Sequence, residues 1–363
     1  MVGAYYGAHL VALEHRFYGD SIPTDLTTEE LVHLNSEQAL SDIAGFIRQY
    51  NQFNPERQVI VVGGSYPGAL SAWFRERYPH LADASWASSG VVYPIQDFWK
   101  FDEQIYTSTR YSGDECPALI QNITAEMDKA LLAGGQVRND TIHAMGAYAG
   151  MENFDFSFFF ADIFVESVQY GNRTDLCDLM NQTANLTFSD KLPYLRNFSE
   201  RINVGPSDYC RHNLQNPNTT SVAGRSWTYQ YCTEFGFFQV PSQEHPMRSR
   251  QFLNESSWSE YCNDIFGTDL KVNRTIGEYA FRHTAGSNTI FTNGWEDPWQ
   301  WATELNPNAR INQQGSLANC TDCGHCGDLY TPLESDPWEL NAERNSVLAF
   351  LDPILTSDEA YFI

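Results

Sequence analysis

The chain has 363 residues, 42% of them hydrophobic and 14% aromatic, so it can bury a large core and is too long for one ordinary small domain. Its 22 basic and 46 acidic residues give a formal net charge of −24, which disfavours nucleic acid and anionic membrane surfaces as partners. No apolar run is long enough to span a bilayer. Such an acidic surface suits an acidic compartment, and it also serves solubility.

The most informative predicted turn follows a strand. Residues 58–62, Gln-Val-Ile-Val-Val, predict a buried strand, and a helix is predicted directly after Gly-Gly-Ser-Tyr-Pro-Gly at residues 63–68. Strand, serine and helix in this order are typical of a nucleophile elbow, a strained turn that exposes a serine above a parallel sheet. Ser65 is therefore the candidate nucleophile and the Tyr66 N–H the candidate oxyanion donor; an ordinary Gly/Ser turn is the alternative. Pro67 stands where the G-x-S-x-G pattern has its second glycine, and proline suits a first helical turn.

Two later loops supply the partners that a serine nucleophile needs. Residues 288–292 predict a short buried strand, which leads into a loop with Glu296 and Asp297. A later loop of small residues contains His325 and Asp328. The order serine, acid, histidine is that of an α/β-hydrolase triad. We predict Asp297 as the acid and His325 as the base; Glu296 and Asp328 compete for the acid role, unless they are solvated loop carboxylates.

The middle of the chain differs from both flanks. It lacks strand-like apolar runs and shows helical stretches, such as residues 118–132 and 158–170. We expect an α/β-hydrolase sheet with an inserted, mainly helical cap, entered after a strand-like segment at residues 84–92 and left before residues 276–283. A helix near residues 338–351 is expected to pack against the sheet. The expected parts are the first hydrolase part, the cap and the second hydrolase part, at residues 1–110, 111–275 and 276–363.

Modification signals point to the secretory route. Ten N-x-S/T sequons indicate a glycosylated surface, and eight cysteines in that compartment indicate disulfides first. Cys320-x-x-Cys323-x-His325-Cys326 also allows a metal knuckle, but a second cysteine pair to complete four zinc ligands is not at hand, so we expect no metal. The sequons are at Asn122, Asn139, Asn172, Asn181, Asn185, Asn197, Asn218, Asn254, Asn273 and Asn319.

Several blocks in order resemble the S28 serine peptidases, a family with lysosomal Pro-Xaa carboxypeptidase, dipeptidyl peptidase II and thymus-specific serine protease. These blocks are residues 13–21, 34–42, 63–80 and 293–299, while residues 66–69 and 227–236 resemble the thymus-specific branch. The resemblance implies a secreted or lysosomal serine exopeptidase that cleaves peptides near a chain terminus, after proline or another apolar residue, through an acyl-enzyme and without a cofactor. It places the triad at Ser65, Asp297 and His325.

The same resemblance implies further residue roles. Trp299 is expected to wall the S1 pocket, and Ala69 replaces a methionine of the family and leaves that pocket larger. The implied disulfides are Cys116–Cys177 and Cys232–Cys262. An esterase or lipase with the same triad, and a non-catalytic glycoprotein, are the alternatives, and a homodimer is left open.

The beginning of the sequence carries a separate expectation. Only one predicted strand, at residues 9–14, precedes the nucleophile strand, whereas an α/β-hydrolase has four there. Residues 1–6 also lack the basic and apolar regions of a signal peptide. We expect a truncated chain that lacks about three N-terminal strands and a second oxyanion donor, and that is catalytically poor.

Overall fold

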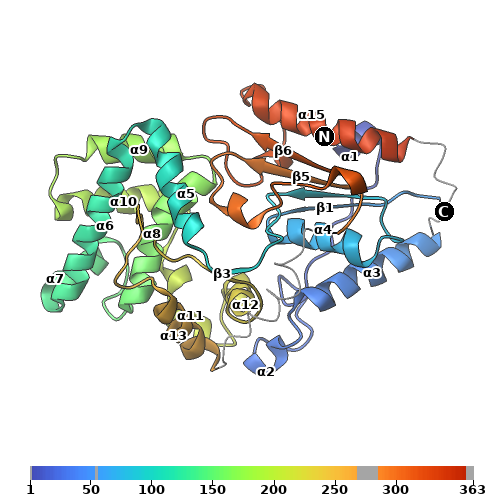
Figure 1. The fold of residues 1–363 in the computed structure, drawn as a ribbon. Coiled ribbons are helices and arrows are strands. Elements are labelled where there is room, and N and C mark those ends of the chain that lie inside the picture. Colours follow the sequence, from blue (N-terminus) through green and yellow to red (C-terminus); the bar gives the residue numbers. More distant parts are fainter. Residues whose placement is uncertain (1, 54–55, 268–284, 357–363) are drawn as a thin grey trace. The chain divides into compact units, whose positions relative to one another are not determined.

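The computed structural model describes residues 2–53, 56–267 and 285–356, which divide into two units (Figure 1). Unit 1 comprises Met1–Pro23, Val32–Pro94 and Asn273–Ile363, and unit 2 comprises Thr24–Leu31 and Ile95–Val272. The division after Pro94 comes earlier than the boundary at residue 110 in the sequence prediction. The predicted exit segment at residues 276–283 and the sequon at Asn273 lie outside the described residues.

Unit 1 is built on a four-stranded parallel sheet. Its order is β1-β2-β5-β6, with Val62 opposite Trp86 and Trp86 opposite Ile290. Strands β2 and β5 are buried along their whole length, as expected of central strands in a parallel sheet. The three strand predictions in this region are therefore confirmed, with shifts of a few residues at their ends. The strands are β1 Ile60–Gly64, β2 Ala84–Ser88, β5 Thr289–Gly294 and β6 Gln313–Ala318.

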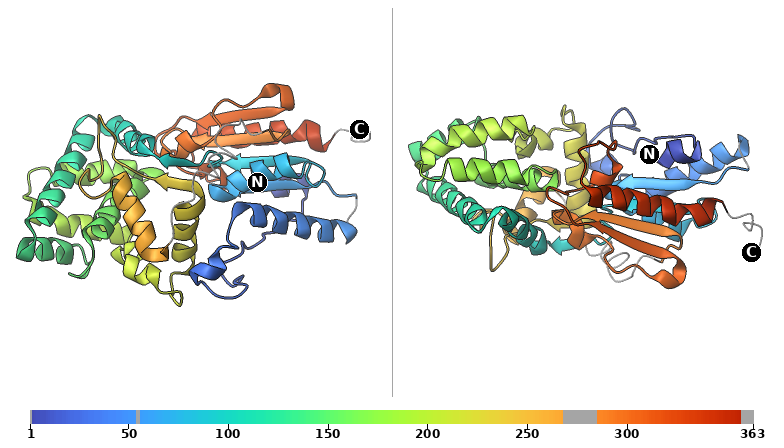
Figure 2. Two further views of the ribbon diagram at one scale, coloured as in Figure 1. Left: turned by 60° about the horizontal axis from the view of Figure 1, so that its bottom comes forward. Right: turned by 90° about the horizontal axis from the view of Figure 1, so that it is seen from above.

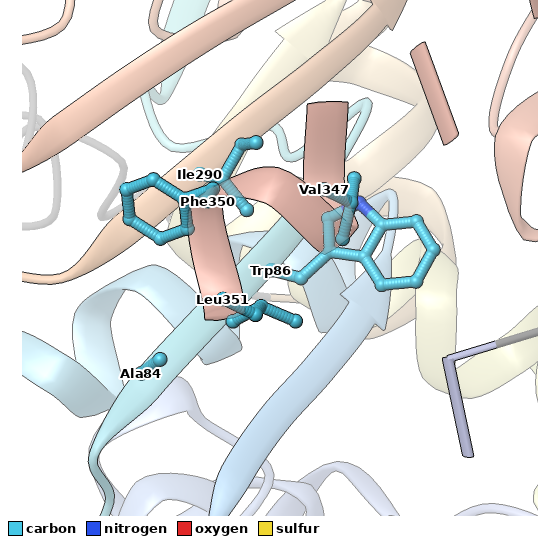
Figure 3. Close-up of a cluster of buried hydrophobic side chains, with 6 residues drawn as sticks. All are labelled: Ala84, Trp86, Ile290, Val347, Phe350 and Leu351. Atoms are coloured by element: carbon cyan, nitrogen blue, oxygen red, sulfur yellow. The ribbon is translucent and has the colours of Figure 1, made fainter. Parts of the chain in front are cut away.

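Helices cover both faces of this sheet. Helices α1 and α15 lie on one face, and α3 and α4 lie on the other (Figures 1 and 2). Val347, Phe350 and Leu351 of α15 form a buried cluster with Trp86 and Ile290 (Figure 3). Burying such side chains stabilises the unit by roughly 2 kcal/mol each. The predicted closing helix is thus confirmed, and it packs on the central strands. These helices are α1 Val2–Tyr6, α3 Ser36–Phe53, α4 Tyr66–Arg77 and α15 Trp338–Leu355.

The segment before α3 departs from the prediction. Residues 8–15 form neither a helix nor a strand, so the strand predicted over residues 9–14 is wrong. The side chains of Leu10, Val11 and Leu13 are exposed there. A short apolar run gives a strand only where a neighbouring strand supplies cross-strand pairs, and no described strand pairs with this segment.

Unit 2 is mainly helical. Its short ladder pairs β3, Ile95–Asp97, with β4, Gly236–Phe238. The helical stretches predicted at residues 118–132 and 158–170 lie within α6 and α8, apart from residue 170, and both helices begin a few residues earlier than predicted. The helices are α2 Thr28–Leu31, α5 Trp99–Thr109, α6 Glu115–Ala133, α7 Gly135–Ala144, α8 Asn153–Gln169, α9 Arg173–Gln182, α10 Phe188–Arg201, α11 Arg211–Gln215, α12 Val222–Gln230 and α13 Glu255–Phe266. Short helical turns occupy Arg110–Ser112, Pro206–Tyr209, Tyr231–Phe235 and, in unit 1, Ala309–Ile311.

Disulfides and buried ion pairs hold unit 2 together. Cys116–Cys177 joins α6 to α9, and Cys232–Cys262 joins the turn after α12 to α13, which are the two pairs that the family resemblance implies. Arg248 Nε donates to Asp102 Oδ1 at 3.2 Å, and both side chains are almost fully buried. None of the described helices in either unit is long and apolar enough to cross a membrane.

Candidate active site

Ser65 occupies the turn between β1 and α4 in a strained conformation. Its φ of 60° and ψ of −125° are sparsely populated for a residue with a side chain. The backbone N–H of Ser65 donates to the carbonyl of Ser88 at 2.9 Å, which ties the turn to the end of β2. A Cβ atom on Gly63 would lie 2.0 Å from the carbonyl oxygen of Pro67, so only glycine fits before this turn. The local geometry is therefore that of a nucleophile elbow.

A second glycine is needed one position later than in the usual pattern. A Cβ atom on Gly68 would lie 2.8 Å from the Cα atom of Gly90 and 3.0 Å from the carbonyl oxygen of Ser88. The first turn of α4 thus passes directly over the residues that follow β2. Pro67 occupies the first turn of α4, where its missing N–H costs no helical hydrogen bond.

The predicted acid and base lie in hydrogen-bond contact. His325 Nδ1 and Asp297 Oδ2 are 2.8 Å apart, and both side chains are buried. The other carboxylate oxygen of Asp297 accepts the backbone N–H of Trp299 at 2.9 Å, at the start of the helical turn Pro298–Ala302. Because the carboxylate only accepts, Nδ1 of His325 carries a proton, and in the neutral ring Nε2 is the unprotonated nitrogen that can act as the base. This tautomer is the one that a serine nucleophile requires.

The electrostatics of His325 favour its charged form. Burial lowers the pKa of the imidazole, but the Asp297 carboxylate and the Cys326 thiol outweigh that effect and raise the pKa above its usual value. The imidazolium that forms when the base accepts a proton is therefore stabilised in place.

Close backbone contacts bring the three loops to one edge of the sheet. A Cβ atom on Gly294 would lie 2.2 Å from the carbonyl oxygen of Gly324, and one on Gly64 would lie 2.9 Å from Cys326 Sγ. The histidine loop therefore borders both the acid loop and the residue before Ser65. All three loops follow carboxyl ends of parallel strands, which meet at one edge of such a sheet.

The two competing carboxylates bond elsewhere. Asp328 accepts hydrogen bonds from Trp86 Nε1 at 3.2 Å and from Thr292 Oγ1 at 2.5 Å, and burial raises its pKa. Glu296 accepts the backbone N–H of Asp322 at 3.0 Å. Asp297 is the carboxylate that bonds Nδ1 of the imidazole.

Helix α15 contributes two buried polar residues that the sequence analysis missed. Glu343 Oε1 accepts the backbone N–H of Asn293 at 3.2 Å, and burial together with the nearby Asp328 raises its pKa to about 8. Arg344 donates to the carbonyls of Asp328 at 3.2 Å and Gly327 at 3.1 Å, which anchors the histidine loop. The sequence signal that could have identified them is a pair of adjacent charged residues in the part of the helix that packs on the core.

The other predicted site residues differ in exposure. Tyr66 is the first residue of α4, so its backbone N–H lies at the N-terminus of the helix. The Trp299 ring lies 6.2 Å from the imidazole of His325 and retains 9% exposure. Ala69 has 0% exposure and therefore offers no surface to a substrate in this structure.

The cysteines around His325 include a third disulfide. Cys320 bonds Cys323, while Cys210 and Cys326 are free thiols. Within the described part of the chain, no group of three histidine, cysteine, aspartate or glutamate side chains is placed to hold a metal ion.

The family match and the most similar known proteins all point to serine peptidases. The chain matches the family described as serine carboxypeptidase S28 over residues 2–347. It is 37% identical over 347 residues to the probable serine protease EDA2 of Arabidopsis thaliana, covering 89% of this chain and 68% of that protein. Human thymus-specific serine protease is 29% identical over 378 residues, with coverages of 94% and 73%. Mouse lysosomal Pro-X carboxypeptidase is 26% identical over 319 residues, with coverages of 80% and 65%.

Proposed function

Because the chain belongs to the S28 family of serine peptidases, we propose that Ser65, Asp297 and His325 form a catalytic triad that cleaves peptide bonds near a chain terminus. The observation that carries the proposal is the buried hydrogen bond between Asp297 and His325. The loop that carries His325 also borders the strained turn at Ser65. The α/β fold with its parallel sheet supplies the matching framework.

The proposed reaction proceeds through an acyl-enzyme. Nε2 of His325 accepts the hydroxyl proton of Ser65 while the Ser65 oxygen attacks the scissile carbonyl carbon. Asp297 holds the imidazole and stabilises its positive charge. His325 then gives the proton to the departing amine, and a water molecule, activated in the same way, releases the acyl group from Ser65.

The N–H of Tyr66 is the proposed oxyanion donor. It lies next to the nucleophile at the N-terminus of α4, where backbone N–H groups and the helix dipole favour negative charge. One such donor contributes about 10²–10³-fold to the rate.

We base the proposed substrate preference and cellular location on the family. We propose an apolar S1 subsite beside Trp299, and a peptide substrate cut near one terminus. Unit 2 is proposed as the inserted cap domain, with carbohydrate on its sequons. A lysosomal or extracellular location fits relatives such as a lysosomal Pro-X carboxypeptidase.

Covalent labelling tests the proposal. A fluorophosphonate probe should label the protein at Ser65, and mass spectrometry of the digested adduct should identify that peptide. Ser65→Ala should remove the label, whereas Ser71→Ala, a change of a buried serine within α4, should retain it. A peptide library with free and blocked termini then shows which end is trimmed. Labelling of another serine, or cleavage that persists in Ser65→Ala, contradicts the proposal.

A further inference from the structure

The side chain of Tyr66 takes part in a hydrogen-bonded network. Its hydroxyl lies 3.0 Å from Nε2 of His15 and 3.5 Å from Oγ of Ser36, and its side chain is 7% exposed. The His15 and Tyr66 rings also pack at 5.5 Å between centroids. The residue that would present the oxyanion N–H is thus held by a second element of unit 1.

The direction of these hydrogen bonds follows from one fixed acceptor. Nδ1 of His15 lies 2.7 Å from the backbone carbonyl of Arg16, and a carbonyl only accepts, so Nδ1 carries the proton. In the neutral ring Nε2 is then an acceptor, and the Tyr66 hydroxyl must donate to it. Ser36 is left to donate to the Tyr66 oxygen. The donor and acceptor roles are mutually consistent, and together these bonds restrain the Tyr66 side chain.

The segment that carries His15 is itself anchored. The Arg16 guanidinium binds both carboxylate oxygens of Asp42 in α3, at 2.6 and 2.7 Å, and donates to the carbonyl of His33 at 3.1 Å. Such bidentate pairs fix geometry as well as charge. Burial lowers the pKa of His15, which keeps its ring in the neutral form that accepts from Tyr66. Residues 8–15 lack regular structure, yet their last residue has a defined position.

We propose that His15 is a positioning residue, which holds Tyr66 through its hydroxyl so that the backbone N–H of Tyr66 is aimed at the oxyanion. The inference rests on the proposed function, because this donor has a role only if the chain catalyses acyl transfer through Ser65. His15 touches neither substrate nor reacting atoms in this arrangement; it acts through Tyr66.

The expected effect falls on the chemical step. Oxyanion donors contribute most when they are already in place as charge develops, and small misplacements near a reaction centre cost large factors in rate. Tyr66→Phe retains the N–H and the ring but removes the bond to His15. We expect kcat to fall about 10-fold, less than the loss of a whole donor, with KM unchanged.

Three variants separate positioning from simple stability. His15→Leu should lower kcat as Tyr66→Phe does, and the double variant should be no worse than either one, because both remove the same bond. His15→Gln keeps an amide oxygen that can accept from Tyr66, and should restore most of the lost rate. The matched control is Tyr50→Phe, which breaks the comparable hydrogen bond between His9 and Tyr50, 3.0 Å long, on the exposed surface; its kcat should equal that of the parent.

Rates must be expressed per active site titrated with the fluorophosphonate probe. A structural role alone would lower the titrated fraction and the melting temperature but leave kcat per site unchanged. Unchanged kcat in Tyr66→Phe and His15→Leu, or multiplied losses in the double variant, overturns the inference. If the parent protein neither labels nor cleaves peptides, the proposed function itself fails, which is a distinguishable result.

Discussion

Two buried carboxylates, one in each unit, are paired with different basic side chains. The comparison distinguishes a pair that can take part in catalysis from a pair that only stabilises the fold. In unit 1 Asp297 bonds the imidazole of His325 at 2.8 Å, and in unit 2 Asp102 bonds the guanidinium of Arg248 at 3.2 Å. All four side chains are buried. An arginine never releases its proton in a protein, whereas an imidazole gains and loses one near neutral pH. The first pair can therefore take part in proton transfer, while the second can only neutralise charge.

The surroundings of the two carboxylates agree with this contrast. Asp297 lies on a loop after β5, and its second oxygen accepts a single N–H, from Trp299. Asp102 lies within α5 and also accepts the backbone N–H groups of Ser242 and Met247 at 2.9 and 3.0 Å. We expect changes at the strand ends of unit 1 to cost rate with little stability, and changes around Arg248 to cost stability with little rate.

The largest expected effect is at Ser65. Ser65→Ala and Ser65→Gly should both lower kcat by about 10⁶-fold, the order of loss when a serine nucleophile is removed. Glycine also relieves the positive φ of this turn, so Ser65→Gly should be more stable than Ser65→Ala by about 1 kcal/mol. Peptidase assays and urea denaturation measure the two effects. Equal stability of the two variants would show that the turn is not strained.

Asp297 comes next. Asp297→Asn should leave a folded protein with kcat reduced about 10⁴-fold, because the amide favours the wrong imidazole tautomer. Glu296→Gln, which changes the neighbouring buried carboxylate, should lose less than about 10-fold, since Glu296 bonds a loop N–H. Steady-state kinetics on both variants test the assignment. A larger loss in Glu296→Gln than in Asp297→Asn would exchange their roles.

In unit 2 the comparison predicts a loss of stability instead. Arg248→Met leaves Asp102 buried without its cation, which should lower the free energy of unfolding by about 3–5 kcal/mol. The exposed pair of Arg196 and Glu200 is the control, and Arg196→Met should cost no more than about 0.5 kcal/mol. Denaturant titration gives both values. Folded Arg248→Met should keep the kcat of the parent per titrated active site. A loss of rate without a loss of stability would contradict the assignment of the Asp102–Arg248 pair to stability.

The smallest effect concerns pH. Burial raises the pKa of Asp162 in α8 to about 7, and Arg248 only partly offsets it. The folded state therefore holds a proton that the unfolded state releases near pH 4, so stability should fall as pH rises from about 4 to 7. Asp162→Asn should reduce that slope by about 1 kcal/mol per pH unit. Asp175→Asn, at an exposed carboxylate, should leave the slope unchanged. Melting temperatures at pH 5 and pH 7 provide the measurement.

Much of unit 1 is predictable because its signals are local. The β-branched runs at residues 58–62 and 288–292 predict strands that the structure places in the sheet. Chain order and loop context favour Asp297 and His325 over the competing carboxylates, and the structure brings these two residues together. The strand predicted from the apolar run at residues 9–14 is wrong because a strand also needs a neighbouring strand, which a single segment does not reveal. Propensity within a segment and pairing between segments are separate requirements.

The parts that escaped prediction depend on contacts far apart in sequence. In the sequence Glu343 and Arg344 look like ordinary charged residues of a helix. Only the packing of α15 in the fold brings Glu343 to the backbone of Asn293 in β5 and Arg344 to the loop that carries His325. The bond between His15 and Tyr66 joins residues 51 positions apart. Residue type predicts what a side chain can do, and the fold decides which partner it meets.

The close contact between Gly68 and Gly90 has a consequence for how such turns evolve and are recognised. The geometric demand is for a small residue wherever the first turn of α4 passes over the end of β2, and in this chain that crossing falls at Gly68, next to Pro67. A search pattern written with fixed glycine spacing overlooks sequences of this kind. A description in terms of the two backbones that touch would retrieve them, and it would also tell a protein engineer which pair of positions must remain small together.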